Sequence, residues 1–411
     1  AKTILLNCAE CEPLLRLHRQ LLKFHAPEIV SAFDETRKSV GAEEGIVCIK
    51  EHYKGAINAV TALLPEYPAL KLKVLRKVYP AGDEVMLIYD ATGKVVRPGG
   101  LPIESGVAVF NVETMYNAYH ALKGEPLVSK LVTIAGEVAQ PKTLRLPLGA
   151  KLSEAIKLAG GETIKDYVYW VGGPMMGRIA SPSDPVTKTT NSVFVLPSDA
   201  FVVNKLRSDV KIEVGRAAAS CCQCRTCTDM CPRNNVGHPI EPHKIMRAAA
   251  CNDFSDVSAF LNTFYCCGCG VCELYACPQG LSPRKLIQTI KGALRANGVK
   301  PPKDTQASEV NPMRDFRRVP LERLVSRLGV KKYQADAPLD NQLIDGFSEV
   351  NILCSQHIGA PAVPVVKVGD KVERGQVVAK AAEGLSVNIH ASISGIVTGV
   401  TPKCITVKKV D

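Results

Sequence analysis

No uninterrupted run of about eighteen apolar residues, the length that an α-helix needs to cross a membrane, occurs in the 411-residue sequence. The first residues, AKTILLNCAECEP, lack an initiating Met and also lack the charged start, apolar stretch and small-residue cleavage site of a secretory signal. Aromatic residues are scarce at 5%, and the basic residues behind the formal net charge of +11 are scattered, with no stacking motif between them. We therefore predict a cytoplasmic chain with no membrane span and no nucleic-acid partner.

Cysteine, in contrast, is abundant. The chain has 16 cysteines, many of them gathered in C-x-x-C runs. A disulfide framework is typical of small secreted domains and does not fit a chain of this length. Thiolates that bind metal in the reducing cytosol fit better, and anionic metal centres would lower the true net charge. The remaining basic surface suits an acidic protein or a phosphate-bearing cofactor.

The chain is too long for one ordinary domain, and its patterns divide it into five parts. Residues 1–124 alternate strand-like runs such as TILLN and GVAVFN with helical stretches, which predicts an α/β layer with parallel strands. Residues 125–205 have the pattern of a compact α+β module, and residues 206–297 are predicted to be mainly helical. Residues 298–340 have the Pro and polar content of a linker, and residues 341–411 predict a small all-β barrel or sandwich. The predicted fold class is therefore multidomain, with α/β and α+β units.

Two cysteine clusters, CCQCRTCTDMCP and CCGCGVCELYACP, give the strongest chemical signal in the sequence. In each, three cysteines follow at x2 spacing and a fourth precedes a proline, a pattern typical of proteins with two 4Fe-4S clusters, where the fourth cysteine binds the other cluster. Zinc would need only four ligands in two pairs, so the three-plus-one pattern favours iron–sulfur. The predicted ligands of one cluster are Cys221, Cys224, Cys227 and Cys277, and those of the other are Cys266, Cys269, Cys272 and Cys231.

Two further cysteines in these runs are predicted to be bystanders. Cys222 and Cys267 each directly follow a first ligand, and one residue of offset turns their side chains away from the three-cysteine face. Two clusters in one module relay single electrons rather than act on a substrate. Another part of the chain or a partner must therefore donate electrons to them or accept electrons from them.

Four segments near the front carry a more specific resemblance. NCAECEPLL, YPAGDE, GGLP and FNVET resemble the flavin-binding domain of one family. That family includes the NADH-binding subunit of respiratory complex I, the RnfC component of the Rnf ferredoxin:NAD oxidoreductase and the cobalamin reductases of propanediol-utilisation microcompartments. VGGPMMG resembles the family's soluble-ligand-binding β-grasp (SLBB) domain, which covers the second part, and the cysteine runs resemble its two-cluster ferredoxin insert. The resemblance covers nearly the whole chain.

The order of the parts separates these relatives. QHIGAPAVPVVKVGDKVERGQVV resembles a barrel-sandwich hybrid module that RnfC has at its front, whereas here it lies near the C-terminus, as in the cobalamin reductases. The module also resembles biotinyl and lipoyl carriers, but NIHASISG occupies the hairpin where a carrier lysine belongs. We therefore expect a docking module without a swinging arm.

The resemblance implies an FMN site in the Rossmann-like front domain. One group of residues would line one side of the isoalloxazine ring, a second would form another wall, and a third would lie at a strand-to-helix junction where a phosphate meets helix-terminal amides. The family's Gly-rich loop, which wraps the flavin phosphate, should precede TILLN and is absent from this sequence. In order, the three groups are Asn7, Glu10 and Glu12; Gly82, Asp83 and Glu84; and Asn111 and Thr114.

The resemblance also implies the activity of an NADH-dependent cobalamin reductase. FMN would accept a hydride from NADH and pass single electrons through two 4Fe-4S clusters to cobalamin, in support of B12-dependent diol metabolism. The implied partners are NADH, cobalamin or a cobalamin-handling enzyme, and shell or pathway proteins of a bacterial microcompartment, whose lumen is the implied location. Two alternatives are an Rnf-type electron-entry subunit and a non-enzymatic iron–sulfur electron conduit.

Overall fold

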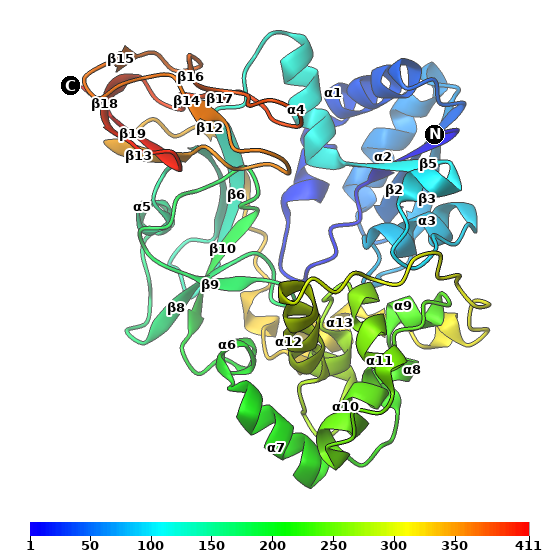
Figure 1. Ribbon diagram of the computed structural model, residues 1–411. Helices are drawn as coiled ribbons and strands as arrows, with labels where there is room; N and C mark the ends of the chain where they lie inside the picture. The colour runs from blue at the N-terminus through cyan, green and yellow to red at the C-terminus, as the bar shows by residue number, and fades with distance from the viewer. Residues whose placement is uncertain (411) are drawn as a thin grey trace.

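The computed structural model describes residues 1–410, and its front unit is a four-stranded parallel sheet in the order β3-β2-β1-β5 (Figure 1). This confirms the predicted α/β layer. Apolar side chains alternate between the two faces: Ile4 and Leu6 of β1 pack with α1, α2 and α4, whereas Leu5 packs with α3. The elements are β1 (Thr3–Asn7), α1 (Leu17–Ser39), β2 (Glu44–Lys50), α2 (Lys54–Leu63), β3 (Leu70–Leu75), β4 (Val78–Tyr79), α3 (Glu84–Thr92), β5 (Val107–Asn111) and α4 (Val112–Leu122).

The strand order places a topological switch beside β1. After β1 the chain moves outward through β2 to β3, and it then returns to add β5 on the other side of β1. Asn7 and Asn111, the last residues of β1 and β5, are partners in the parallel register. Open α/β sheets bind their ligands outside the carboxyl ends of the strands at such a point. The loops that follow Asn7 and Asn111 are therefore where this fold favours a ligand.

The second unit is a six-stranded mixed sheet in the order β12-β7-β6-β10-β8-β9, packed against the short helix α5. Most of the sheet comes from one stretch of chain, but β12 (Leu339–Leu343) arrives from much later in the sequence and adds parallel to β7. The other elements are β6 (Ser129–Gly136), β7 (Lys142–Pro147), α5 (Leu152–Leu158), β8 (Tyr167–Val171), β9 (Arg178–Ala180) and β10 (Ser192–Pro197).

The C-terminal unit has two small sheets, β13-β19-β18-β15 and β14-β16-β17, which confirms the predicted all-β module. Its apolar side chains, such as Ile352 and Val397, share one core with Ile134 of the second unit. A Cβ on Gly149, whose φ is +92°, would lie 2.8 Å from the backbone of Asn351, so glycine lets these two units touch. The strands are β13 (Glu349–Leu353), β14 (Val363–Pro364), β15 (Lys371–Val372), β16 (Val377–Lys380), β17 (Ile389–His390), β18 (Gly395–Val400) and β19 (Cys404–Lys408).

Short helices, with cysteine runs in the turns between them, form the unit at the bottom of Figure 1. Prolines at the first position of α9, α10 and α12 keep these helices from extending back into the loops before them. No helix within residues 1–410 is both long and apolar enough to cross a membrane. The helices are α6 (Phe201–Arg207), α7 (Val210–Ser220), α8 (Thr226–Asp229), α9 (Pro232–Asn235), α10 (Pro242–Cys251), α11 (Val257–Leu261) and α12 (Pro283–Ala296).

The segment 298–340, predicted as a linker from its Pro and polar content, is in part structured and buried. Here β11 (Val319–Pro320) pairs with β4, and α13 (Leu321–Arg327) buries Leu324 and Val325. These two side chains enter a core to which the front unit, the second unit and the cysteine-bearing unit all contribute. The linker prediction is wrong for this part, because the few apolar positions of one short helix are masked by a polar average composition.

Candidate functional site

Four of the predicted cluster ligands line one hollow in the cysteine-bearing unit. It lies between the C-terminal end of α7, the helix α8 and the loop that leads into α12. Cys224 is exposed, whereas Cys227 and Cys277 are buried. Cys222, predicted as a bystander, lies at the edge of the same hollow and is exposed. We call Cys221, Cys224, Cys227 and Cys277 the outer thiol group.

The other four predicted ligands line a second and deeper hollow, which we call the inner one. Cys269 and Cys272 are each less than a tenth exposed, and two cations, Arg233 and Arg284, also line the hollow. The structure thus brings the fourth cysteine of each motif to the other motif's three, which is the exchange that the spacing predicts. We call Cys231, Cys266, Cys269 and Cys272 the inner thiol group.

Both thiol groups suit a 4Fe-4S cluster better than a single ion. In the part of the chain that the structure describes, no three His, Cys, Asp or Glu side chains converge closely enough to hold one metal ion. Zinc needs its thiolates at about 2.3 Å from one point, whereas the four ligands of a cubane bind four different irons and lie farther apart. Burial raises the pKa of Cys227 and of Cys231 to about 12. A metal centre must therefore displace protons from these thiols when it binds.

The two loops predicted to form the walls of a flavin site pack against each other at the carboxyl end of β1. Nδ2 of Asn7 donates to the carbonyl oxygen of Gly82 at 2.9 Å, and Oδ1 of Asn7 accepts from the amide of Ala9 at 3.1 Å. A Cβ on Gly82 would lie 2.3 Å from the carbonyl oxygen of Ala9, so this approach requires glycine. Glu84, from the same wall, is exposed. The structure therefore brings these two predicted segments together.

Glu10 is buried and fixes the start of α1. Its Oε1 accepts from the amides of Leu17 and His18 at 3.0 and 3.3 Å, and its backbone carbonyl accepts from Nζ of the buried Lys50 at 3.1 Å. Burial raises the pKa of the Glu10 carboxyl to about 7 and lowers the pKa of Lys50. Oε2 of Glu10 has no hydrogen-bond partner among residues 1–410. One carboxyl oxygen is therefore left over for a ligand.

Glu12 connects the front unit to the second unit. Its Oε2 accepts from the amide of Met175 at 2.9 Å, and burial raises the pKa of its carboxyl to about 7. Its Oε1, like Oε2 of Glu10, is buried and finds no partner within the described residues. Buried polar atoms normally have a partner, and both unpartnered oxygens lie in the loop predicted to bind FMN. The residues present thus fit that cofactor.

Asn111 and Thr114 lie on the other side of the topological switch. Oδ1 of Asn111 accepts from the amide of Glu113 at 2.9 Å and caps α4, and Thr114 is exposed on the first turn of that helix. The first amides of a helix are unpaired and carry the positive end of its dipole. This junction therefore presents donors suited to a phosphate.

The loop from Gly82 to Glu84 also joins the front unit to the inner thiol group. The Asp83 carboxylate caps α3 and pairs with the guanidinium of Arg233 at 2.8 Å. Arg233 follows Cys231 by two residues. The hydroxyl of Tyr79 donates to the carbonyl oxygen of Cys269 at 2.7 Å. Flavin-domain side chains thus contact the chain segments that hold the inner thiols.

Sequence reasoning missed the residues that make these contacts between units. Arg233 directly follows the Cys-Pro of the first motif, and a cation at that position was the one signal that could have found it. Arg284, which pairs with Glu273 at 3.1 Å and donates to the carbonyl of Met175, lies in no motif. Its role follows only from the way the units are packed.

Comparison with known families identifies the units. Residues 1–120 match the Nuo51 FMN-binding domain, residues 131–179 the SLBB domain, residues 220–282 a 4Fe-4S dicluster domain, and residues 326–410 the RnfC barrel sandwich hybrid domain. These matches confirm the kinds of unit predicted and identify FMN and two 4Fe-4S clusters as the cofactors. The last match begins inside the predicted linker, in agreement with the structured part found there.

Two relatives resemble the chain over nearly its whole length. "Cobalamin reductase PduS" of Citrobacter freundii is 40% identical over 98% of this chain and 89% of its own length. The protein of the same name from Salmonella typhimurium is 39% identical over 98% of this chain and 89% of its own length. A component of the Na(+)-translocating ferredoxin:NAD(+) oxidoreductase complex of Acetobacterium woodii is 30% identical over 56% of this chain and 50% of its own length.

Proposed function

The chain belongs to the family of the PduS cobalamin reductases, and from this premise we propose that it reduces cobalamin with electrons taken from NADH. Its flavin and iron–sulfur cofactors are those of an electron-transfer oxidoreductase. FMN, when bound, supplies hydride acceptance and release of single electrons, and the clusters relay those electrons. The observation that carries the proposal is the contact between the flavin-domain loops and the inner thiol group.

This contact sets the order of the route. Tyr79 and Asp83 of the front unit touch Cys269 and Arg233 beside the inner thiols, so a cluster held by that group would receive electrons first. The outer thiol group includes the exposed Cys224 and lies closer to a surface that an acceptor can reach. We infer that electrons enter at the inner cluster and leave from the outer one.

The protein's own side chains position the flavin and balance its charge. Glu10 and Glu12 would offer their unpartnered carboxyl oxygens to the ring of a bound flavin, and Lys50 donates to the backbone carbonyl of Glu10. A pKa of about 7 lets Oε1 of Glu12 hold or release a proton near neutral pH. The amides of α4 beside Asn111 and Thr114 would hold the phosphate of the bound flavin.

The test is anaerobic purification followed by cofactor analysis and an acceptor assay. We expect about eight iron atoms per chain, because two 4Fe-4S clusters are bound, together with FMN. We expect NADH to support reduction of cobalamin faster than of ferredoxin or of a quinone. If the full-length chain contains iron but no flavin, the protein is a non-enzymatic electron conduit. Faster reduction of ferredoxin than of cobalamin would favour an Rnf-type electron-entry subunit.

We propose in addition that the protein works in the lumen of a bacterial microcompartment, with shell or pathway proteins as partners. The support for this finer statement is the family resemblance. Fractionation of cells that form microcompartments tests it, because the protein should sediment with the shells and resist added protease until the shells are opened. Recovery in the unsedimented fraction would contradict it.

A further inference from the structure

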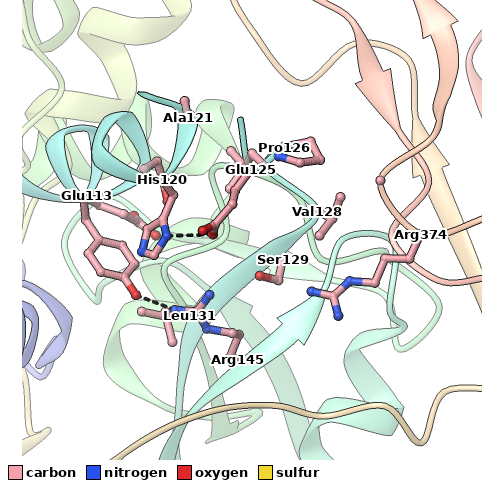
Figure 2. A pocket seen from close by; sticks show the side chains of 14 residues that line it. Glu113, His120, Ala121, Glu125, Pro126, Val128, Ser129, Leu131, Arg145 and Arg374 are labelled. Carbon is pink, nitrogen blue, oxygen red and sulfur yellow. Dashed lines mark hydrogen bonds and ion pairs between the residues drawn. The ribbon is translucent and has the colours of Figure 1, made fainter. Parts of the chain in front are cut away.

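A cavity of about 390 Å³ lies where the front, second and C-terminal units meet (Figure 2). One side is formed by α4, another by the chain that leads into β6, and a third by the turn after β15 that carries Arg374. Its volume falls in the range of small-molecule sites, which often form between domains. Its lining shares only Glu113, on the first turn of α4, with the region to which the proposed function assigns a role.

One of the two carboxylates of this cavity is neutralised by a buried cation, and the other is hydrogen-bonded to an imidazole. Glu113 pairs with the buried Lys130, and Glu125 pairs with His120 at 2.8 Å. Lys130 is only 4% exposed, so a buried cation that does not itself line the cavity holds the carboxylate of Glu113. Glu125, whose side chain is 59% exposed, is therefore the one acidic side chain of the cavity that no Lys or Arg pairs with in residues 1–410.

Arg145 brings a positive charge that no carboxylate within residues 1–410 pairs with. Its Nε and Nη2 donate to Oδ1 of Asn341 at 3.0 and 2.6 Å, and Nη2 also donates to the hydroxyl of Tyr116 at 2.6 Å. These neutral acceptors hold the guanidinium in place, with its centre 5.7 Å from the centroid of the Tyr116 ring. The group is thus preorganised and still has its full charge.

Arg374 supplies a second such charge from the C-terminal unit. Within residues 1–410 its guanidinium forms no ion pair with a carboxylate, and Figure 2 shows it reaching toward Ser129. The hydroxyl of Ser129 has no protein hydrogen bond in this same range. Two guanidinium groups and a free hydroxyl thus line one cavity.

We propose that this cavity binds a small organic phosphate. Nη1 of Arg145 still has its two hydrogens for a ligand, and Arg374 can offer its whole guanidinium fork. A phosphate has enough acceptor oxygens for both groups, whereas one fork already occupies both oxygens of a carboxylate. The apolar lining, from Ala121, Pro126 and Leu131, then contacts the organic part of the ligand. A free nucleotide and the phosphodiester within a cobalamin share this chemistry.

Isothermal titration calorimetry of the anaerobically prepared full-length protein tests the site, with inorganic phosphate, AMP and cyanocobalamin as separate titrants. We expect AMP or cyanocobalamin to bind more tightly than phosphate, and the tighter of the two identifies the source. Arg374→Gln and Arg145→Gln should each weaken that binding about tenfold or more, because a charge-assisted contact is lost. Lys371→Gln is the matched control, since Lys371 is exposed on β15 but lies outside the cavity.

Arg374 makes the decisive variant because its side chain is exposed and no packing depends on it. Binding that Arg374→Gln leaves unchanged would overturn the proposal, as would the absence of binding by all three titrants. If Arg145→Gln proves unstable through loss of its bonds to Asn341 and Tyr116, Ser129→Ala provides the second variant, with a smaller expected loss. Weaker binding at higher salt, in proportion to the charge of the titrant, would support an electrostatic site.

Discussion

The two thiol groups come from nearly the same motif, yet they lie in different surroundings. The outer group has an exposed Cys224, flanked by the exposed residues Gln223 and Arg225. The inner group has Cys269 and Cys272 buried, with the guanidinium groups of Arg233 and Arg284 in its lining and with parts of the front and second units packed on it. The spacing of the cysteines defines a cluster site, and the packing of the other units determines which partner that cluster can exchange electrons with.

This difference explains how electron transfer through a two-cluster module acquires a direction. The inner group lies against the flavin domain and has no exposed thiol among its four. A centre near the surface is open to an acceptor. Substitutions that alter one thiol group and leave the other intact therefore test the assigned order of electron transfer. The expected losses of turnover range from nearly complete to none.

The largest effect is expected from removal of one ligand in either group. Cys272→Ala and Cys224→Ala should each reduce NADH-driven cobalamin reduction by about a hundredfold or more, because the relay is broken. They should differ in what NADH can still reduce. With Cys224→Ala, NADH should still reduce the inner cluster, whereas with Cys272→Ala the outer cluster should respond only to dithionite. EPR spectroscopy after each reductant distinguishes the two cases.

The control for this pair is the spectrum of each variant reduced with dithionite alone, which reports whether the other cluster has survived. The order of the route is reversed if NADH reduces the outer cluster in Cys272→Ala but fails to reduce the inner one in Cys224→Ala. Equal behaviour of the two variants would mean that the flavin feeds both clusters directly.

The second effect concerns the cations beside the two groups. Arg233 pairs with Asp83 at 2.8 Å and both side chains are largely buried, so Arg233→Gln should lower the free energy of unfolding by about 3 kcal/mol. It should also make the reduction potential of the inner cluster more negative, because a positive charge near the added electron is lost. Arg225→Gln beside the outer group breaks only exposed pairs, at 3.7 and 3.8 Å, and should cost less than about 1 kcal/mol.

Chemical denaturation and redox titration followed by EPR measure the two quantities. Arg233→Lys gives a further control, since it keeps the charge but loses the guanidinium geometry, and it should preserve the potential better than the stability. An unchanged inner potential in Arg233→Gln would show that Arg233 holds the units together without influencing the cluster.

The sequence predicts the parts of this molecule that depend on nearby residues. Apolar strand-like runs such as TILLN and GVAVFN predict β1 and β5. The three-plus-one spacing predicts that Cys231 and Cys277 each join the three cysteines of the other motif. What it does not predict depends on contacts between distant segments. The Asp83–Arg233 pair joins residues 150 positions apart, and β12 joins a sheet formed almost 200 residues earlier.

The failure at residues 298–340 has the same cause. The average composition of that segment is polar, and only the partners of Leu324 and Val325 in three other units make α13 a buried element. For the flavin loop, the motif identifies Glu10 and Glu12 but does not show that each already shares one carboxyl oxygen with a backbone amide. Those amides belong to α1 and to the second unit.

A smaller effect on stability is expected from pH, through the carboxyl group of Glu12. Burial raises the pKa of Glu12 from its ordinary 4.5 to about 7, so the folded protein holds this proton more tightly than the unfolded chain does. The free energy of unfolding should therefore fall as pH rises through about 7, by about 1 kcal/mol between pH 6 and 8 for this group. Glu12→Gln, which cannot ionise, should remove that part of the pH dependence.

Thermal unfolding at pH 6 and pH 8 measures this difference. Glu241→Gln, beside the outer group and partly open to solvent, is the matched control and should leave the pH dependence as it is in the unmodified protein. A Glu12→Gln profile parallel to that of the unmodified protein would mean that Glu12 stays ionised when buried.

The smallest effect is expected from the two cysteines that follow a first ligand. Cys222→Ser and Cys267→Ser should each leave the iron content and both EPR signals unchanged, because each hollow already has its four predicted thiols. The two residues should differ in access: Cys222 is exposed and should react with iodoacetamide in the cluster-loaded protein, whereas Cys267 is partly buried and should react more slowly. Loss of about half the iron in Cys222→Ser would identify it as a ligand of the outer cluster. The outer cluster would then have two exposed ligands, Cys222 and Cys224, whereas none of the four inner thiols is exposed.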